Sequence, residues 1–141
     1  MKFVPNLLLA TALVSGALSA GELENDLAKA QKERKPVLYV ILSKSCGACE
    51  GWTERLRSEP EIVDRIDKCA ETMFVYSDHA VHTDRYPVNG FPTGYILDPD
   101  GKIIFRFSGV PKSDREFADY LCKIRDAISG AAGRQRKGGK K

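Results

Sequence analysis

The sequence predicts an α/β domain in which helices alternate with short strands. Three apolar runs have the length of strands, at residues 37–42, 72–76 and 102–107, and helical patterns of spaced apolar residues separate them. A strong turn signal, Asp98-Pro99-Asp100-Gly101, indicates a β-hairpin near the end of this series. The chain has 141 residues, 43% of them hydrophobic, which is enough for one core but hardly for two.

Residues 1–20 are expected to be a secretory signal peptide that precedes the domain. Lys2 provides the positively charged n-region, residues 7–14 form the apolar h-region, and small residues follow at the expected cleavage position. The apolar stretch is short for a membrane span, which disfavours an uncleaved anchor. Cleavage would leave a domain over residues 21–129 in an oxidising compartment, where disulfides persist.

The first half of the domain is expected to run helix, strand, helix, helix. Leu23, Leu27 and Ala30 share one face of a predicted helix over residues 22–35, and Pro36 ends it before the strand at 37–42. A second helix follows this strand directly. A third helix begins at Pro60, because proline is tolerated in the first helical turn.

The second half is expected to run strand, loop, hairpin, helix. After the strand at 72–76, residues 77–89 are polar and irregular, and residues 90–98 form a strand that opens with a proline. The turn described above joins it to the strand at 102–107. The last helix opens with a capping box formed by Ser113 and Glu116.

Residues 130–141 are expected to be a disordered basic tail. The formal net charge is +3, to which Lys2 contributes +1 and the tail +5, so the segment between them carries −3. Glycines and basic residues without apolar partners favour disorder. We expect a solubilising end, with contact to anionic surfaces as the alternative.

The segment Cys46-Gly47-Ala48-Cys49 lies where the strand at 37–42 gives way to the second helix. The free N–H groups and the positive dipole end of a helix stabilise a thiolate, which lowers the thiol pKa from about 8.5. Gly47 and Ala48 are small and leave the backbone donors near the first sulfur open. This position is typical of a reactive cysteine.

Helical spacing predicts different environments for the two cysteines. Cys49, Thr53 and Leu56 fall on a stripe that should face the core, with Trp52 on its flank. Cys46 should then be exposed at the tip of the helix. An exposed attacking sulfur beside a buried resolving sulfur suits thiol–disulfide exchange.

Other roles for a Cys-x-x-Cys pair fit less well. A zinc site needs a second pair of ligands, but Cys69 and Cys122 stand alone, and His79 and His82 lack the spacing of a Cys₂His₂ unit. A c-type haem attachment needs histidine where Glu50 stands. A permanent structural disulfide stays open, although a redox-active pair fits a strand-to-helix junction better.

The order of elements, together with Cys46-Gly47-Ala48-Cys49 and Phe91-Pro92-Thr93, resembles the thioredoxin superfamily over residues 22–129. The resemblance implies a thioredoxin-like fold with a central four-stranded mixed sheet flanked by helices. It also implies that Pro92 follows a cis peptide bond beside the dithiol. Phe91, Pro92 and Thr93 would then bind substrate, with the backbone around Phe91 free to pair with an extended chain.

The cysteine motif is similar to that of small thioredoxin-domain proteins of the endoplasmic reticulum, although it departs from thioredoxin in several ways. Thioredoxin has a buried acid six residues before its first cysteine, and Val40 stands there, so an internal base for Cys49 is missing. Ser45 replaces the usual aromatic residue, and no histidine separates the cysteines, which argues against an extreme oxidant. Lys44 is expected to be a solvated surface residue.

The remaining candidates have simpler interpretations. Cys69 is expected to be buried and Cys122 to lie near the polar side of the last helix, so two unpaired thiols are favoured over a disulfide. His79 and His82 are expected to be solvated loop residues.

The combined prediction is a secreted or lumenal protein-disulfide oxidoreductase, located in the endoplasmic reticulum or, in a bacterium, in the periplasm. Cys46 would attack, Cys49 would resolve the mixed disulfide, and no metal or organic cofactor is needed because the dithiol carries the electrons. The expected partners are cysteine-containing client proteins and a redox partner that resets the pair. We expect a monomer with no nucleic-acid partner and no membrane anchor after cleavage.

Two questions stay open at this level. The reduction potential, and with it the direction of electron flow, depends on hydrogen bonds to the sulfurs that a sequence does not show. The alternative function is a non-catalytic binding or chaperone module, in which the two cysteines are structural or only tether clients. Val40 in place of the usual acid favours that alternative.

Overall fold

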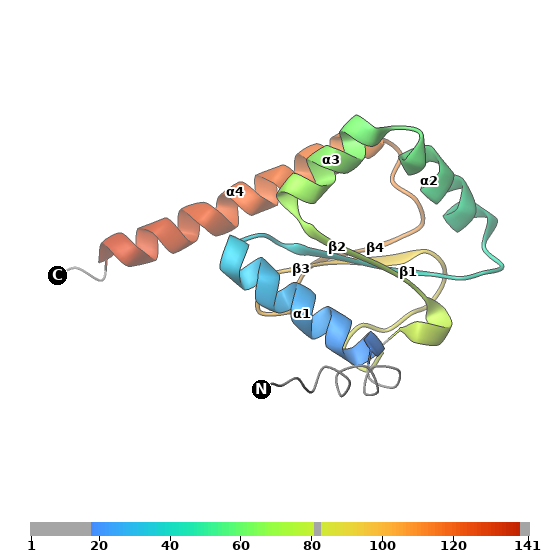
Figure 1. Ribbon diagram of the computed structural model, residues 1–141, viewed down its shortest axis with the longest axis horizontal. Coiled ribbons are helices and arrows are strands. Elements are labelled where there is room, and N and C mark those ends of the chain that lie inside the picture. Colours follow the sequence, from blue (N-terminus) through green and yellow to red (C-terminus); the bar gives the residue numbers. More distant parts are fainter. Residues whose placement is uncertain (1–17, 81–82, 139–141) are drawn as a thin grey trace, which may run out of the picture.

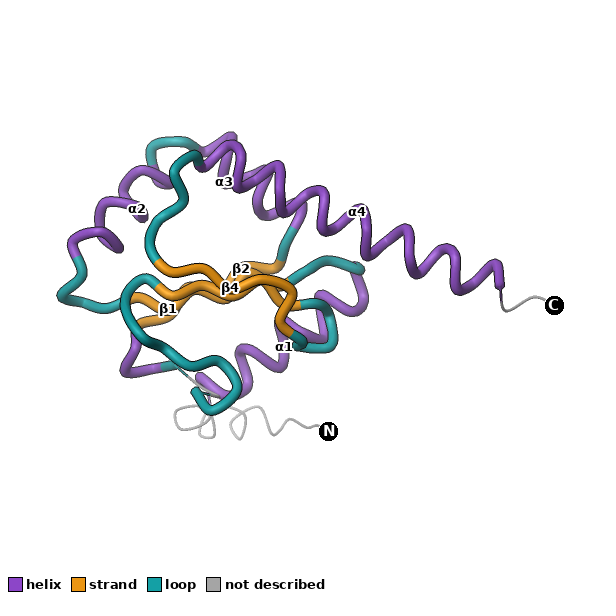
Figure 2. The backbone as a smooth tube through the Cα atoms, turned by 180° about the vertical axis from the view of Figure 1, so that it is seen from behind, coloured by secondary structure: helices purple, strands orange, loops and turns teal. Residues whose placement is uncertain are grey.

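The computed structural model describes residues 18–80 and 83–138. A four-stranded mixed sheet forms the centre, with α1 on one face and α2, α3 and α4 on the other (Figures 1 and 2). The prediction of a thioredoxin-like α/β fold is confirmed. Its elements are α1 (Leu18–Glu33), β1 (Val37–Leu42), α2 (Gly47–Arg57), α3 (Pro60–Cys69), β2 (Glu71–Tyr76), the 3₁₀ turn η2 (Ser77–His79), β3 (Thr93–Leu97), β4 (Ile103–Ser108) and α4 (Asp114–Gly138).

The central strand β1 separates two apolar layers. The sheet order is β2-β1-β3-β4, with β1 parallel to β2 and antiparallel to β3. All of β1 is buried, as expected for a continuous apolar run covered on both faces. Leu38 and Val40 face the layer under α2, α3 and α4, whereas Tyr39 and Ile41 face the layer under α1.

Strands β3 and β4 form the predicted hairpin, but their pairing is irregular at one point. Ile96 pairs with Phe105 and Leu97 pairs with Ile103, so Ile104 is left without a partner in the ladder. The side chains of Ile103, Ile104 and Phe105 are more than 40% exposed. The β4 edge is therefore apolar and bulged.

The N-terminal helix begins earlier than predicted. Residues 1–17 of the predicted signal peptide lie outside the described residues, but α1 opens at Leu18, so the predicted domain start at 21 falls inside its first turn. At its other end, Arg34 adopts a left-handed φ of 58°, and the Lys35 N–H donates to Ala30 O at 3.0 Å. This is the Schellman arrangement, which ends α1 just before Pro36.

The last helix is longer than predicted. Its start is as expected, since Ser113 Oγ accepts a hydrogen bond from the Glu116 N–H at 3.2 Å. It continues to Gly138, however, and extends past the body of the domain (Figure 1). The prediction of disorder from 130 is wrong as far as 138, because alanine, arginine, glutamine and lysine favour helix and outweigh the glycines among them. Residues 139–141 lie outside the described residues.

Trp52 is more central than its predicted place on the flank of α2. Its side chain is only 1% exposed, whereas Thr53 and Leu56 are half-buried. The indole packs against the rings of Phe74, Phe107 and Phe117. A position on the flank of the stripe is compatible with this burial, because α4 covers that flank of α2, which a single helix pattern does not reveal.

A buried carboxylate ties α2 to the start of α4. Asp114 accepts hydrogen bonds from Trp52 Nε1 at 3.0 Å and from Arg55 Nε at 2.7 Å. The Asp114 side chain is 4% exposed and that of Arg55 is 44% exposed. Asp114 therefore links a buried donor to a cation that reaches solvent.

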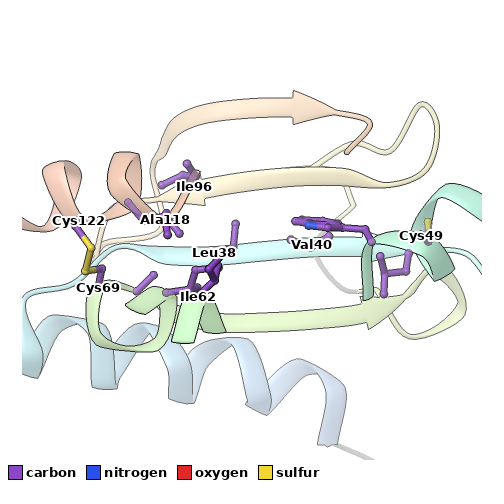
Figure 3. Close-up of a cluster of buried hydrophobic side chains, with 13 residues drawn as sticks. Leu38, Val40, Cys49, Ile62, Cys69, Ile96, Ala118 and Cys122 are labelled. Carbon is purple, nitrogen blue, oxygen red and sulfur yellow. A yellow bond between two sulfur atoms is a disulfide. The ribbon is translucent and has the colours of Figure 1, made fainter. Parts of the chain in front are cut away.

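Cys69 and Cys122 form a disulfide between α3 and α4, with Cα atoms 4.8 Å apart. The expectation of two unpaired thiols was wrong. Cys122 lies beside the apolar stripe of α4 and its sulfur points toward α3, where it meets Cys69. Figure 3 shows this bridge at one end of the core and Cys49 at the other.

We expect the Cys69–Cys122 bridge to stabilise the fold strongly. It spans 53 residues, so replacing both cysteines by alanine should lower the free energy of unfolding by about 2–4 kcal/mol. Urea unfolding without reductant would measure this loss. In the presence of dithiothreitol the parent and the variant should unfold at similar urea concentrations, and equal midpoints without reductant would contradict the prediction.

Asp114→Ala should lower the free energy of unfolding by about 2–4 kcal/mol, because it leaves the buried Trp52 N–H without an acceptor. Tryptophan fluorescence during urea unfolding reports on this site directly. The matched control is Asp119→Ala, which removes a surface ion pair with Arg65 and should cost less than about 1 kcal/mol. Similar losses in the two variants would argue against a special role for Asp114.

Candidate functional site

The dithiol segment begins in a short turn at the end of β1. The Cys46 N–H donates to Ser43 O at 3.3 Å, and the Ser45 N–H donates to Ser43 Oγ at 3.3 Å. Serine favours such turns because its hydroxyl can replace a backbone acceptor. The turn ends with Cys46 as the N-cap residue of α2.

Cys46 and Cys49 are joined as a disulfide, with Cα atoms 5.3 Å apart. Cys46 is half-buried and Cys49 is 3% exposed, so the predicted contrast between an accessible and a buried sulfur is confirmed. The Cys49 N–H donates to Cys46 Sγ at 3.0 Å. When the bond is reduced, this donor and the positive end of α2 favour a thiolate at Cys46.

The surroundings of Cys49 are apolar. Cys49 belongs to the buried cluster that also contains Val40 and Trp52, and Val40 is fully buried on β1. Within that cluster, valine occupies the position where the resemblance to thioredoxin would place an acid. The cluster therefore supplies no proton acceptor for Cys49 from this strand.

Lys44 is the solvated surface residue that the sequence predicts, since its side chain is 70% exposed, and it also has an ionic partner. Its Nζ lies 3.5 Å from Asp78 Oδ2 and 5.8 Å from the centre of the Tyr76 ring. Desolvation raises the pKa of Asp78, but a backbone hydrogen bond and the charge of Lys44 outweigh it and lower that pKa overall. Because both side chains are mostly exposed, this ion pair is weak.

His79 does not form a site with the cysteines in the part of the chain that the structure describes. His79 Nε2 lies 3.7 Å from Asp78 Oδ2 and is 66% exposed, and His82 lies outside the described residues. Among residues 18–80 and 83–138, no cluster of histidine, cysteine and carboxylate side chains is arranged to hold a metal ion.

The peptide bond between Phe91 and Pro92 is cis, as predicted. Thr93 pairs with Ile41 in the antiparallel ladder, so Pro92 lies at the end of β1 that leads into the dithiol turn. Pro92 O accepts a hydrogen bond from the Gly109 N–H at 2.9 Å. These contacts fix the loop before β3 at the same end of the sheet as Cys46.

The three predicted substrate-binding residues differ in accessibility. Phe91 is 40% exposed, and its backbone N–H and C=O have no hydrogen-bond partner among the described residues. Thr93 is fully buried, and its hydroxyl donates to Gly90 O at 2.6 Å, so its side chain has a structural role. A substrate contact through Phe91 and Pro92 stays a prediction.

A groove of about 310 Å³ opens beside the dithiol, between α2 and the end of β2. Charged side chains of both signs surround it, and Arg57 is paired with Glu54. The sequence interpretation did not include Tyr76, which is 44% exposed here; the parallel pairing of β1 and β2 brings the ends of both strands together. The residues that line the groove include Lys44, Cys46, Cys49, Thr53, Arg57 and Tyr76.

Solved structures share this fold at low sequence identity. A disulphide isomerase from Xylella fastidiosa Temecula1 is 21% identical with a TM-score of 0.60, over 84% of this chain and 98% of that one. A poplar thioredoxin h is 18% identical with a TM-score of 0.59, over 75% of this chain and 90% of that one. The oxidised C-terminal domain of Neisseria meningitidis DsbD is 17% identical with a TM-score of 0.59, over 75% of this chain and 95% of that one.

No curated protein sequence matches the chain. In the described segments, none of the helices combines the length and the apolar character that crossing a membrane requires.

The family model of a thioredoxin-like domain matches residues 23–125, which include the dithiol, the cis-proline loop and all four strands. The chain therefore belongs to the thioredoxin-like domain family.

Proposed function

We propose that this protein is a thiol–disulfide oxidoreductase that acts on cysteine-containing proteins. The observation that carries the proposal is the arrangement of the dithiol. Cys46 caps α2 at a partly open position, accepts the Cys49 N–H, and is bonded to a sulfur that is almost fully buried. A disulfide that is accessible from one side only directs exchange to Cys46.

In the reductive direction, the Cys46 thiolate attacks one sulfur of a client disulfide. A bond forms between Cys46 and the client, and the other client sulfur leaves as a thiolate that takes up a proton. Cys49, after losing its proton to water, then attacks Cys46 and releases the second client thiol. Two electrons pass from the dithiol to the client, and an external dithiol must reduce Cys46–Cys49 again.

The cis-proline loop supports the proposed handling of an extended client. Phe91 presents an exposed ring at the end of the sheet that carries Cys46, and its backbone N–H and C=O have no hydrogen-bond partner within the described segments. An extended client segment pairs with these groups, which holds its sulfur against Cys46. Pro92 supplies no N–H of its own and fixes the direction of the loop.

We place this activity in the secretory pathway, or in the periplasm if the source is bacterial. The support is the pattern of residues 1–20, with Lys2 before an apolar stretch and small residues after it. The proposed partners are client proteins with cysteines and a second redox protein that resets the pair, and the working form is a monomer.

Insulin reduction with dithiothreitol as electron source tests the proposal. The parent protein should accelerate insulin precipitation, and Cys46→Ser should reduce the rate to that of dithiothreitol alone, because the attacking sulfur is lost. Cys49→Ser should accumulate a mixed disulfide with insulin, visible by mass spectrometry without reductant. The double variant Cys69→Ala/Cys122→Ala is the control and should keep its activity. Equal rates for the parent and Cys46→Ser would instead support a binding module.

The reduction potential of Cys46–Cys49 should lie between those of thioredoxin and protein disulfide isomerase, about −270 to −180 mV. The Cys49 N–H stabilises the thiolate of Cys46, but no histidine lies between the two cysteines to strengthen this effect. Equilibration against glutathione in the Cys69→Ala/Cys122→Ala background would measure it. A potential well below about −300 mV would identify a structural disulfide and contradict the proposed activity.

A further inference from the structure

Strand β2 is an edge of the sheet that ends at the dithiol. It pairs with β1 on one side, and no described residue pairs with its other side. Because β1 and β2 are parallel, the last residue of β2, Tyr76, lies beside the turn that leads to Cys46. Figure 3 shows β2 running toward the end of the core where Cys49 lies.

A groove flanks this edge on each face of the sheet. The α1-side groove, of about 430 Å³, is lined by Glu22, Asn25 and Asp26 of α1 together with Thr72, Met73, Phe74 and Val75 of β2. The α3-side groove is also about 430 Å³ and is lined by Leu56, Pro60, Val63 and Phe74, with Asp64 at its rim. The first groove is acidic and the second is mainly apolar.

The α3-side groove adjoins the groove beside the dithiol. Thr53 and Arg57 line both of them. A chain that occupies the α3-side groove therefore lies next to the groove that contains Cys46. This route lies on the β2 side of β1, whereas the cis-proline loop lies on the β3 side.

We infer that the β2 edge is a docking site for an extended client segment that carries the reacting cysteine at one end. The inference rests on the proposed function and adds a substrate class to it. Strand addition supplies main-chain hydrogen bonds, and alternate side chains of the added strand enter pockets on opposite faces of the sheet. Apolar side chains fit the α3-side groove, and basic side chains fit beside Glu22 and Asp26 on the α1 side.

The alternation of β2 itself supports this mode of binding. Phe74 packs with the layer under α2, α3 and α4, whereas Met73 and Val75 pack with the layer under α1. A strand added next to β2 repeats this alternation, with a rise of about 3.3 Å per residue. The client's apolar residues should therefore lie within about six residues of its cysteine.

The test uses synthetic peptides whose single cysteine is disulfide-bonded to thionitrobenzoate. The reduced protein attacks this bond through Cys46, and the coloured thiolate that leaves is measured directly. The first peptide alternates leucine and lysine next to its cysteine, the second has serine in place of leucine, and the third carries N-methyl groups on alternate amides. Hydroxyethyl disulfide, which is too small to occupy the edge, reports the chemistry of Cys46 alone.

With the parent protein, the serine and N-methyl peptides should each lose about tenfold or more in the second-order rate constant for release of thionitrobenzoate, because one loses apolar burial and the other loses main-chain pairing. Val63→Glu should remove most of the preference for leucine, taken as the ratio of the second-order rate constants of the leucine and serine peptides. The matched control is Ile104→Glu on the β4 edge, which should leave that ratio unchanged. Equal rates for all three peptides, or equal ratios in the two variants, would overturn the inference.

Two further outcomes, a failure of the disulfide chemistry and self-association of the protein, can be distinguished from the outcomes above. If the parent does not reduce hydroxyethyl disulfide, the proposed function fails, and the docking site is then tested by fluorescence anisotropy of labelled peptides with Cys46→Ser. In that binding assay the leucine peptide should bind more tightly than the serine and N-methyl peptides. Equal affinities for the three peptides would overturn the inference. A dimer in sedimentation that Val63→Glu dissociates would assign the edge to a second copy of the chain and would likewise overturn it.

Discussion

The hydrogen bonds that Asp114 accepts from Trp52 and Arg55 set the position of α2, and with it the position of the dithiol. Trp52 is the centre of an aromatic group that includes Phe74 from β2 and Phe117 from α4. Asp114 is the first residue of α4. Its carboxylate therefore fixes both the position of the Trp52 indole on α2 and the start of α4. Cys46 lies at the free end of the helix that this contact holds.

The two disulfides lie at opposite ends of one apolar layer and differ in accessibility. Cys69 and Cys122 are 2% and 8% exposed and join two helices that an ion pair also connects. Cys46 is half-buried, and a polar groove opens beside it. The buried bridge stabilises the domain and is poorly reached by reagents, which leaves the more accessible Cys46–Cys49 pair available for exchange.

Features that depend on local sequence could be predicted, whereas those that depend on the meeting of two elements could not. The strands, the hairpin turn and the Ser113 cap follow from apolar runs and turn chemistry, and the cis bond before Pro92 followed from resemblance. The pairing of Cys122 and the burial of Trp52 depend on α4 crossing the flanks of α3 and α2, which no single helix pattern contains. The acceptor role of Asp114 was missed for the same reason, because its donors lie far away in the sequence.

The bulge at Ile104 has a consequence for solubility. A sheet with two flat, receptive edges can grow copy by copy, because each added molecule offers a new edge to the next. In this protein β2 pairs in an unbroken register, whereas β4 breaks its register at Ile104, and a bulge twists an edge away from further pairing. If two copies of the chain associated through their β2 edges, the assembly would therefore stop at two copies. The apolar residues exposed on the bulged β4 edge would not extend it into a fibril.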